Sequence, residues 1–368
     1  MSYNTRETTV SLSRSNSSLL VKVGSVFNKL DKALPRARAV RKRIVLRFPS
    51  RLNAMAIDPA RIVPTATHIY TPGEVVFSIA LFRTVRLRLR DDGELKITES
   101  SKRRPIIRHA YLLMKKALKF TNGFDIEVDN QNEMRHCGFG SSGSLIAAVA
   151  YAINEMYGNP IDDASLVRYL AQNHAEEIDG EENRLHHIQC IGGSATSGAF
   201  GGLLVLAGQS RLIARMEISS DFKVVIGLPG DFRAADSRTL MAAEMRNLNK
   251  FLRTGVRFGK TIAYNILHRM LPAMAEGDLA TVGDVIYGYR FGMGSIQNCA
   301  FTYKSLPSLC GRLAYLKRRS IADVLSISSV GPAIFAITRH PDICAAAFKK
   351  EKLSVFQTVV NNKRYQIS

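Results

Sequence analysis

The sequence predicts an α+β fold with two domains, and three observations support this prediction. The chain has 368 residues, which is long enough for two hydrophobic cores. Segments with the two-residue period of strands and segments with the period of helices both recur along it. A strand pattern at Phe222–Leu228 opens a second series of elements. We therefore expect domains at residues 44–220 and 221–368, preceded by an extension at residues 1–43.

The extension is expected to be a poorly ordered or loosely docked segment. It is rich in Ser, Thr, Asn and basic residues, with one amphipathic stretch at Leu19–Leu34. Its start, Met1–Arg14, lacks the apolar core of a secretory signal, and no apolar run of the chain is long enough to span a bilayer. The five cysteines are scattered and never spaced as CxxC, which argues against a disulfide framework or a zinc site. These features predict a cytoplasmic protein without a membrane partner.

The first domain begins with strands and then alternates helices with strands. Asp91–Gly93 is a hairpin turn signal between two of the strands. The expected strands are Ile44–Phe48, Val75–Leu89, Glu94–Thr98, Gly123–Val128 and Leu203–Ala207. The expected helices are Pro105–Phe120, Leu145–Tyr157 and Ala164–Glu177.

The second domain follows with helices between its strands. After Phe222–Leu228, helical periods occur at Ser237–Leu252, Ala263–Met274 and Leu279–Tyr289. Ile321–Ser326 then leads through the small-residue turn Ser328–Pro332 to a strand at Ala333–Thr338.

The charge is strongly positive, with a formal net charge of +20. Much of the excess lies in Lys29–Arg51, Arg83–Arg90 and Lys102–Lys119. Three interpretations fit: a solvated basic face, a field that attracts an anionic small substrate, or a nucleic-acid surface. Because no nucleic-acid motif accompanies the charge and the chain has no Trp, we do not expect a nucleic-acid partner.

The strongest local signal is the glycine-serine loop His136–Ser144, which leads into an apolar helix. Glycines permit positive φ, and serine hydroxyls and the free N–H groups of a first helical turn form a site for phosphate or diphosphate. The alternative is a glycine-rich turn in which Ser144 only caps the helix. The loop is neither a Walker loop nor a dinucleotide fingerprint.

Three segments, in this order, resemble motifs of one group of proteins. They are Ser50–Asp58, His136–Ser144 and Ser326–Ala336. The glycine-serine loop is similar to the second motif of the GHMP kinases, which wraps ATP phosphates. The ordered trio more closely resembles the β-ribofuranosylaminobenzene 5′-phosphate synthases and the C-nucleoside synthases of the formycin and pyrazofurin type.

This resemblance implies a fold and an activity. The implied fold is a GHMP-kinase-like pair of domains, the first a ribosomal-protein-like α/β domain with a strand meander and the second ferredoxin-like. The synthases use phosphoribosyl pyrophosphate and an aromatic or heterocyclic acid, so the resemblance implies both as substrates, Mg²⁺ as cofactor and a homodimer.

Two positions depart from the relatives. Counting back from Gly201-Gly202 places Ser194 where mevalonate-type kinases carry a catalytic Asp. Because Ser cannot act as that base, the departure weakens the kinase interpretation. Asn53 stands where the synthases usually carry His, which indicates a different acceptor.

The resemblance and the residue chemistry together give a set of candidate site residues. Phosphate contacts are expected from Gly138, Gly140, Ser141, Ser142, Gly143 and Ser144, and from Ser197 and Gly198 in the second glycine-rich segment. Acceptor contacts are expected from Arg51, Asn53, Arg184, Arg233 and Ser329, where the three arginines are unranked candidates for a carboxylate clamp.

The acidic run Glu176–Glu182 supplies candidate magnesium ligands, Asp179 and Glu181, unless it is only a charged helix end in solvent. His136 and His186 are candidate proton carriers, with a capping or core role as the alternative for the His186–His187 pair. His109 is expected at the surface. Asp58 is a candidate base, or a turn-forming residue before Pro59.

Three functions follow from these patterns. The leading one is a transferase that forms a C-glycosidic bond between phosphoribosyl pyrophosphate and an aromatic or heterocyclic acid, with release of pyrophosphate and CO₂. The second is an ATP-dependent kinase of the GHMP type, with its missing base supplied from Asp58. The third is a non-catalytic basic binding protein on the same fold.

Overall fold

The first half of the molecule is a sheet covered by helices. A computed structural model describes residues 20–61, 72–130, 134–188 and 190–368. Within them, a seven-stranded sheet has the order β14-β2-β3-β5-β4, with β8 added beside β3 and β9 beside β8. Its strands are β2 Arg43–Ala56, β3 Glu74–Arg90, β4 Leu95–Ile97, β5 Gly123–Asp129, β8 Leu203–Ala207, β9 Arg211–Met216 and β14 Gln366–Ile367.

Helices α1 to α4 bury the apolar side chains of this sheet. They are α1 Arg104–Leu118, α2 Ser141–Met156, α3 Asp163–Gln172 and α4 Gly193–Phe200. Alternate residues of β2, Ile44, Leu46 and Phe48, pack into one core with nearly the whole of α2. Helix α2 is apolar on all sides because sheet and helices surround it, which fixes the position of its N-terminus.

The second half is a ferredoxin-like domain. Four antiparallel strands have the order β11-β12-β10-β13, and helices connect them in the sequence β-α-β-β-α-β. The strands are β10 Lys223–Pro229, β11 Val324–Ile327, β12 Ile334–Thr338 and β13 Leu353–Thr358. The helices are α5 Ser237–Asn265, α6 Leu271–Glu276, α7 Leu279–Tyr287, α8 Ser295–Asn298, α9 Leu306–Leu313, α10 Tyr315–Arg318 and α11 Pro341–Lys350. The predicted α+β fold class is thus confirmed.

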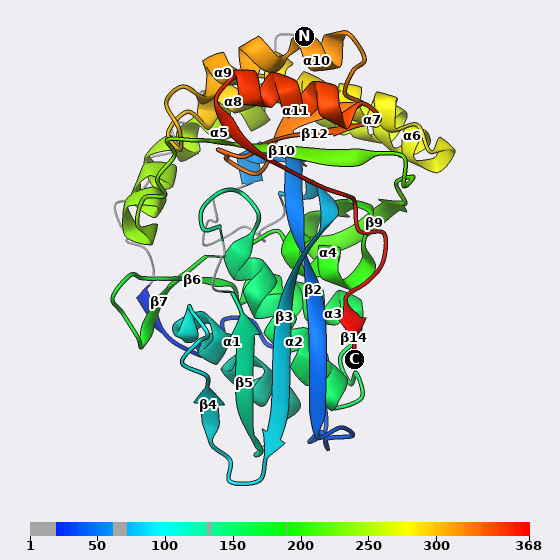
Figure 1. Cartoon of the computed structure of the whole chain (residues 1–368). Helices are drawn as coiled ribbons and strands as arrows, with labels where there is room; N and C mark the ends of the chain where they lie inside the picture. Colours follow the sequence, from blue (N-terminus) through cyan, green and yellow to red (C-terminus); the bar gives the residue numbers. More distant parts are fainter. Residues whose placement is uncertain (1–19, 62–71, 131–133, 189) are drawn as a thin grey trace, which may run out of the picture.

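Strands β2 and β3 connect the two halves physically. Both run from the first sheet toward the second, as Figure 1 shows. Residues late in β2, such as Leu52 and Met55, pack in one core with Phe335 of β12 and Ile226 of β10. The pairing of β2 with β3 is irregular between Asn53 and Met55. This irregularity therefore lies where the two halves meet.

The second domain begins near its expected boundary, but the C-terminal tail returns to the first domain. β10 begins at Lys223, near the predicted boundary at residue 221, but the C-terminal strand β14 returns to the first sheet and pairs with β2. Tyr365 belongs to the first core. The domain of residues 221–368 therefore ends before the tail, which Figure 1 shows beside the lower part of β2.

The N-terminal extension differs from its prediction over the residues that are described. Residues 1–19 lie outside the described residues. Beyond them, β1 Leu20–Lys22 pairs with β7 Arg184–His187, which pairs with β6 Ala175–Glu177. The Phe27 ring stacks on His187 with centroids 3.4 Å apart. Residues 20–43 are thus docked on the first domain, because their apolar side chains complete its core.

His109 secures this docked segment and is not the surface residue that the sequence suggested. It is fully buried, its Nδ1 accepts the Gly24 N–H at 2.9 Å, and its Nε2 lies 2.9 Å from the Asn173 carbonyl. Burial is the main reason that the pKa of His109 falls to about 4. The folded state therefore holds this imidazole neutral, and folding stability decreases as pH falls from about 6.5 to 4.

Replacing His109 with Phe is expected to lower the free energy of unfolding by about 2–4 kcal/mol, because two buried backbone groups lose their partner. The same change removes the contribution of His109 to the stability loss between pH 6.5 and 4, so that loss becomes smaller. Urea unfolding at several pH values measures both effects, and limited proteolysis detects release of residues 20–43. His268→Phe, at an exposed histidine, is the control. Equal stability of the two variants would contradict this role.

The basic stretch of β3 is paired with acids across the sheet. Arg86 lies 3.0 Å from Glu127, and Arg88 and Arg90 lie 2.7 and 2.8 Å from Asp125. These contacts fit the interpretation of a solvated basic face. In the described part of the chain, no helix is long and apolar enough to cross a membrane. All five cysteines are free.

Candidate functional site

The glycine-serine loop lies clamped between the two halves of the molecule. Gly138 has φ +92°, and its carbonyl accepts hydrogen bonds from Ser328 Oγ at 2.6 Å and from Arg51 Nη1 at 3.2 Å. A side chain at Gly138 would overlap the carbonyl oxygen of Ser328. The first and third of the three motif segments therefore meet at the second, and the loop ends at the N-terminus of α2.

Arg103 contacts the first turn of α2, and Arg135 shares the ion-pair partner Glu177 with it. The Arg103 side chain bonds Ser141 Oγ at 3.1 Å and Ser142 Oγ, and its Nε lies 2.9 Å from Glu177. Arg135 lies 2.5 Å from the same Glu177 oxygen. Cations are ordinarily unfavourable at a helix N-terminus, because the helix dipole is positive there. Here acids balance them: Arg103 pairs with Glu176 and Glu177, and Arg135 pairs with Glu177 and Asp179.

Glu176 is the second acid at this end of α2. Its carboxylate accepts a hydrogen bond from Ser142 Oγ, lies 3.1 Å from His174 Nε2 and lies 3.7 Å from Arg103. Burial opposes ionisation, but the hydrogen bond and charge of His174, with Arg103 and Ser142, outweigh it and lower the pKa of Glu176 to about 2. Glu176 is therefore ionised at neutral pH.

We expect the contribution of Glu176 to folding stability to be full above about pH 4.5 and lost as pH falls toward 2, because its pKa is lower in the folded state. Glu176→Gln removes this dependence. Acid titration of the free energy of unfolding, with Glu127→Gln as an exposed control, measures the difference. An unchanged titration in Glu176→Gln would contradict the ion pairing.

Arg51, Asn53 and Ser194 form the opposite wall of the site. Arg51 and Asn53 lie two residues apart on β2 and so share a face of that strand. Ser194 Oγ lies 3.3 Å from the Gly140 carbonyl, and a side chain at Gly140 would overlap Ser194 and Arg51. The Ser329 N–H donates to the Asn53 carbonyl at 2.8 Å. The structure thus brings the predicted acceptor residues Arg51, Asn53 and Ser329 to the loop.

His136 lies between the loop and the second domain. Its φ is +57°, and its Nε2 lies 3.2 Å from Ser237 Oγ at the start of α5. Burial lowers the pKa of His136, and the negative charges of Glu176 and Asp179 only partly oppose this effect. The neutral imidazole is therefore favoured. A neutral imidazole can accept a proton from a bound ligand.

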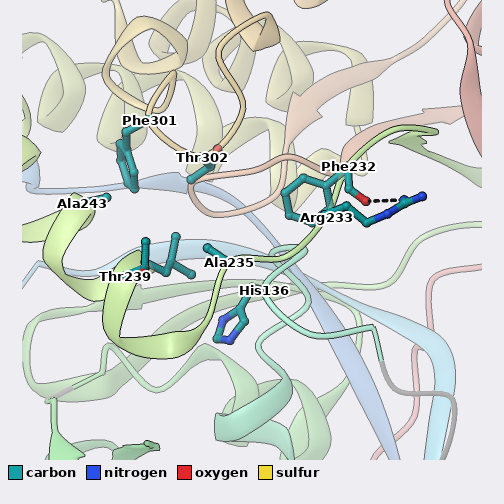
Figure 2. Close-up of a pocket in the computed structure, with 9 residues that line it drawn as sticks. His136, Phe232, Arg233, Ala235, Thr239, Ala243, Phe301 and Thr302 are labelled. Atoms are coloured by element: carbon teal, nitrogen blue, oxygen red, sulfur yellow. Dashed lines mark hydrogen bonds between the residues drawn. The ribbon is translucent and has the colours of Figure 1, made fainter. Parts of the chain in front are cut away.

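A small cavity of about 90 Å³ borders His136, and Phe232 and Phe301 form part of its lining. Figure 2 shows Phe301 and Thr302 across the cavity from His136, with Phe232 to one side. The Arg233 side chain extends away from His136, and its Nη1 bonds the Phe232 carbonyl at 3.0 Å. A shallower pocket of about 250 Å³ adjoins it, lined by Arg135, His136, Asp179, Ala234, Ala235 and Asp236.

Other predicted residues are engaged elsewhere. Glu181 and Arg184 pair with each other at 2.8 Å on the surface, so each already has a partner of opposite charge. Asp179 accepts the Ser237 N–H at 2.9 Å and pairs with Arg135 at 3.1 Å, so both its oxygens have partners. The predicted pair Asp179 and Glu181 therefore does not fit as a magnesium site. Among the described residues, no group of three or more His, Cys, Asp or Glu side chains is arranged to hold a metal ion.

Burial or local bonding also affects three further predictions. Ser197 and Gly198 are buried in α4, and Gly198 lies so close to the Phe48 ring that any side chain would overlap it, so these residues pack instead of binding phosphate. Asp58 Oδ1 accepts the Ala60 N–H at 3.1 Å, which is the turn-forming role. His186 is buried opposite Glu176 across the β6–β7 pair, and neither of its ring nitrogens has a hydrogen-bond partner among the described residues.

Ser144 is also buried, with an Oγ that has no partner among the described residues. Its backbone N–H bonds the Gly140 carbonyl at 2.8 Å within the first turn. In this turn Ser141 and Gly143 are therefore the partly exposed residues, whereas Ser142 and Ser144 are buried.

Sequence reasoning missed Arg103, Glu74 and Glu176 as site residues. Arg103 is 38 residues before Ser141 and belongs to no motif, and Glu74 only begins a strand. The acidic run did give a signal for Glu176, but not for which of its carboxylates faces the loop.

Comparison with known proteins agrees with this geometry. Residues 105–185, which include the loop and α2, match the GHMP kinases N-terminal domain. A β-ribofuranosylphenol 5′-phosphate synthase from Archaeoglobus fulgidus is 26% identical over 220 residues, which cover 59% of this chain. The match spans 65% of that relative's length.

Solved structures share the fold over most of the chain. Lactococcus lactis galactokinase in complex with galactose has a TM-score of 0.62 at 13% identity, covering 89% of this chain and 95% of its own. Staphylococcus aureus mevalonate diphosphate decarboxylase has 0.61 at 12% identity, covering 89% and 98%. Cytophaga hutchinsonii homoserine kinase has 0.57 at 15% identity, covering 90% and 99%. The chain thus matches the GHMP kinases N-terminal domain over residues 105–185 and shares the fold of these solved structures. In sequence it is similar to a β-ribofuranosylphenol 5′-phosphate synthase.

Proposed function

We propose that this protein transfers a 5-phosphoribosyl group from phosphoribosyl pyrophosphate to a ring carbon of an aromatic or heterocyclic acid, releasing pyrophosphate and CO₂. The proposal is carried by one combination: a site suited to an anion is present, whereas the base that a kinase needs is missing. Arg103 contacts the first turn of α2 and shares its partner Glu177 with Arg135. Counting back from Gly201-Gly202 predicts Ser194 where mevalonate-type kinases carry a carboxylate. The name of the A. fulgidus relative describes a ribofuranosyl phosphate on a phenol ring, which supports such substrates.

The reaction needs charge neutralisation more than it needs a base. The bond between ribose C1 and the pyrophosphate oxygen breaks, and its electron pair leaves with pyrophosphate. A ring carbon of the acceptor bonds to C1. Loss of the carboxylate from that carbon as CO₂ returns the electron pair of the broken C–C bond to the ring, so no proton has to be removed.

The described residues can perform the remaining work. Arg103, Arg135 and the N–H groups of the first turn of α2 would neutralise the leaving pyrophosphate. Arg51 lies between this anion site and Asn53 and would orient the acceptor. The cavity with Phe232 and Phe301 offers an apolar wall for a ring. Magnesium remains part of the proposal only as a counter-ion of the diphosphate.

Product analysis tests this proposal. Purified protein is incubated with phosphoribosyl pyrophosphate, MgCl₂ and a panel of aromatic acids labelled with ¹³C in the carboxyl group. We expect pyrophosphate, ¹³CO₂ and a C-glycoside phosphate in equal amounts. A glycoside that retains the label would contradict decarboxylation, and absence of pyrophosphate release with every acid would contradict the transferase. Light scattering of the same preparation tests the proposed homodimer.

The alternative, an ATP-dependent kinase, is favoured by one observation. The carboxylate of Glu74 lies 2.6 Å from the Gly193 backbone nitrogen, next to Ser194. However, Glu74 is only 2% exposed and already accepts two hydrogen bonds, so it has no access to a substrate hydroxyl. ADP formation with small alcohols would support this alternative.

A further inference from the structure

Glu74 carries a buried carboxylate beside Asn53, one of the predicted acceptor residues. One oxygen accepts the Gly193 N–H at 2.6 Å, and the other accepts a hydrogen bond from Asn53 Nδ2. A side chain at Gly193 would overlap the carboxylate, so the close approach requires glycine there. Glu74 therefore joins the start of α4 to the side chain of Asn53.

The backbone of Asn53 is fixed on both sides. Its N–H donates to Ser328 Oγ at 3.0 Å, and its carbonyl accepts hydrogen bonds from the Ser329 N–H at 2.8 Å and from Arg290 Nη2 at 3.2 Å. The backbone of Asn53 is therefore fixed, and only the orientation of its side-chain amide can vary. With Nδ2 bonded to Glu74, Oδ1 has no partner among the described residues.

The chemistry of a carboxylate determines that orientation. An ionised carboxylate only accepts hydrogen bonds, so it selects the NH₂ end of the amide and turns the oxygen away. Burial raises the pKa of Glu74, and the charge of Arg51 and the hydrogen bonds from Gly193 and Asn53 oppose that rise. In the structure both Glu74 oxygens accept hydrogen bonds, as those of an ionised carboxylate do. Arg51 shares the strand face of Asn53 and touches the glycine loop, so the amide lies beside the anion site.

We propose that Glu74 is a positioning residue that sets the polarity of the acceptor site: it holds the Asn53 amide so that Oδ1 accepts a hydrogen bond from a ring O–H or N–H of the bound acid. This inference rests on the proposed function for the place where the acid binds. It adds that the ring must carry a hydrogen-bond donor at that point.

Asparagine side-chain NMR tests the positioning directly and without substrate. In protein labelled with ¹⁵N-asparagine, the Asn53 NH₂ signals are identified by their loss in Asn53→Asp. We expect these signals to shift in Glu74→Gln and to stay unchanged in Glu127→Gln, an exposed control. Unchanged Asn53 signals in Glu74→Gln would overturn the inference, whatever the activity of the protein.

Ligand selectivity tests the polarity. 4-Hydroxybenzoate carries a ring donor, and 4-methoxybenzoate carries only an acceptor oxygen at the same position. With pyrophosphate present, we expect the wild-type protein to bind the hydroxy acid about tenfold more tightly. In Glu74→Gln the new amide donates to Asn53, so Asn53 turns its NH₂ outward and the preference is lost or reversed.

A double variant separates this effect from misfolding. In Asn53→Asp with Glu74→Gln, the new glutamine amide donates to the new aspartate and still accepts the Gly193 N–H. The site then presents an acceptor oxygen again, and we expect preference for the hydroxy acid to return. Equal affinities for both acids in all variants would overturn the polarity assignment. Failure of C-glycoside formation with retained selectivity would count against the proposed function alone.

Discussion

Gly138→Ala is expected to lower the affinity for phosphoribosyl pyrophosphate at least about thirtyfold, which corresponds to about 2 kcal/mol. The backbone at Gly138 has φ +92°, and a methyl group there would overlap the Ser328 carbonyl oxygen. Strain of this kind costs about 1–3 kcal/mol, and relief requires the loop to leave the Ser328 turn. Isothermal titration with the donor substrate measures the loss.

Gly259→Ala provides the matched control for this change. Gly259 lies in α5 with no atom near the position of an added side chain, so alanine there should stabilise the helix slightly and leave binding unchanged. If Gly138→Ala retained wild-type affinity, the clamped loop would not be the anion site.

Arg103→Gln is expected to lower the free energy of unfolding by about 3 kcal/mol and to weaken pyrophosphate binding. The guanidinium is buried against Glu177, and its removal leaves that buried carboxylate with Arg135 alone. Chemical denaturation and titration with inorganic pyrophosphate measure the two effects.

Two further variants test whether the loss of stability in Arg103→Gln comes from the buried carboxylate of Glu177. Adding Glu177→Gln to Arg103→Gln removes the buried carboxylate that has lost its Arg103 partner, while Arg135 keeps Asp179, so the double variant should be more stable than the single one. Arg86→Gln, at an exposed ion pair, should change stability by less than about 0.5 kcal/mol. A double variant less stable than Arg103→Gln would contradict the interpretation of Arg103 as an ion-paired site residue.

The sequence was most informative where chemistry is local. The glycine-serine loop and the helix after it were predicted from residue types alone, because positive φ and a free helix N-terminus leave a clear pattern. The Ser328–Pro332 turn was also found as a small-residue segment. Its contact with Gly138 could not be predicted from spacing, because 190 residues separate the two.

Predictions failed where distant segments override local periodicity. The helix expected at Ala164–Glu177 ends at Gln172, because Asn173 bonds Phe27 in the docked N-terminal segment and β6 pairs with β7. The helix expected to end at Leu252 continues to Asn265 as α5. Gly255 lowers helix propensity there, but it allows Ala60 to pack against the helix.

The same reason explains the site residues that were missed. Arg103 contacts the glycine-serine loop because of how α1 packs, and Glu74 contacts Asn53 because of how β3 packs. An arginine in a basic run before a helix and a single glutamate at the start of a strand carry no recognisable spacing. Conversely, Glu181 and Arg184 looked like site residues but are three residues apart and satisfy each other.

The most direct test of the transferase proposal is a comparison of ligand stabilisation. Thermal unfolding is measured with MgCl₂ and either phosphoribosyl pyrophosphate or ATP. A ligand at a hundredfold excess over its Kd stabilises the folded state by about 2.7 kcal/mol. We expect stabilisation by phosphoribosyl pyrophosphate, reduced in Gly138→Ala, and none by ATP. Stabilisation by ATP alone would contradict the account and identify a kinase.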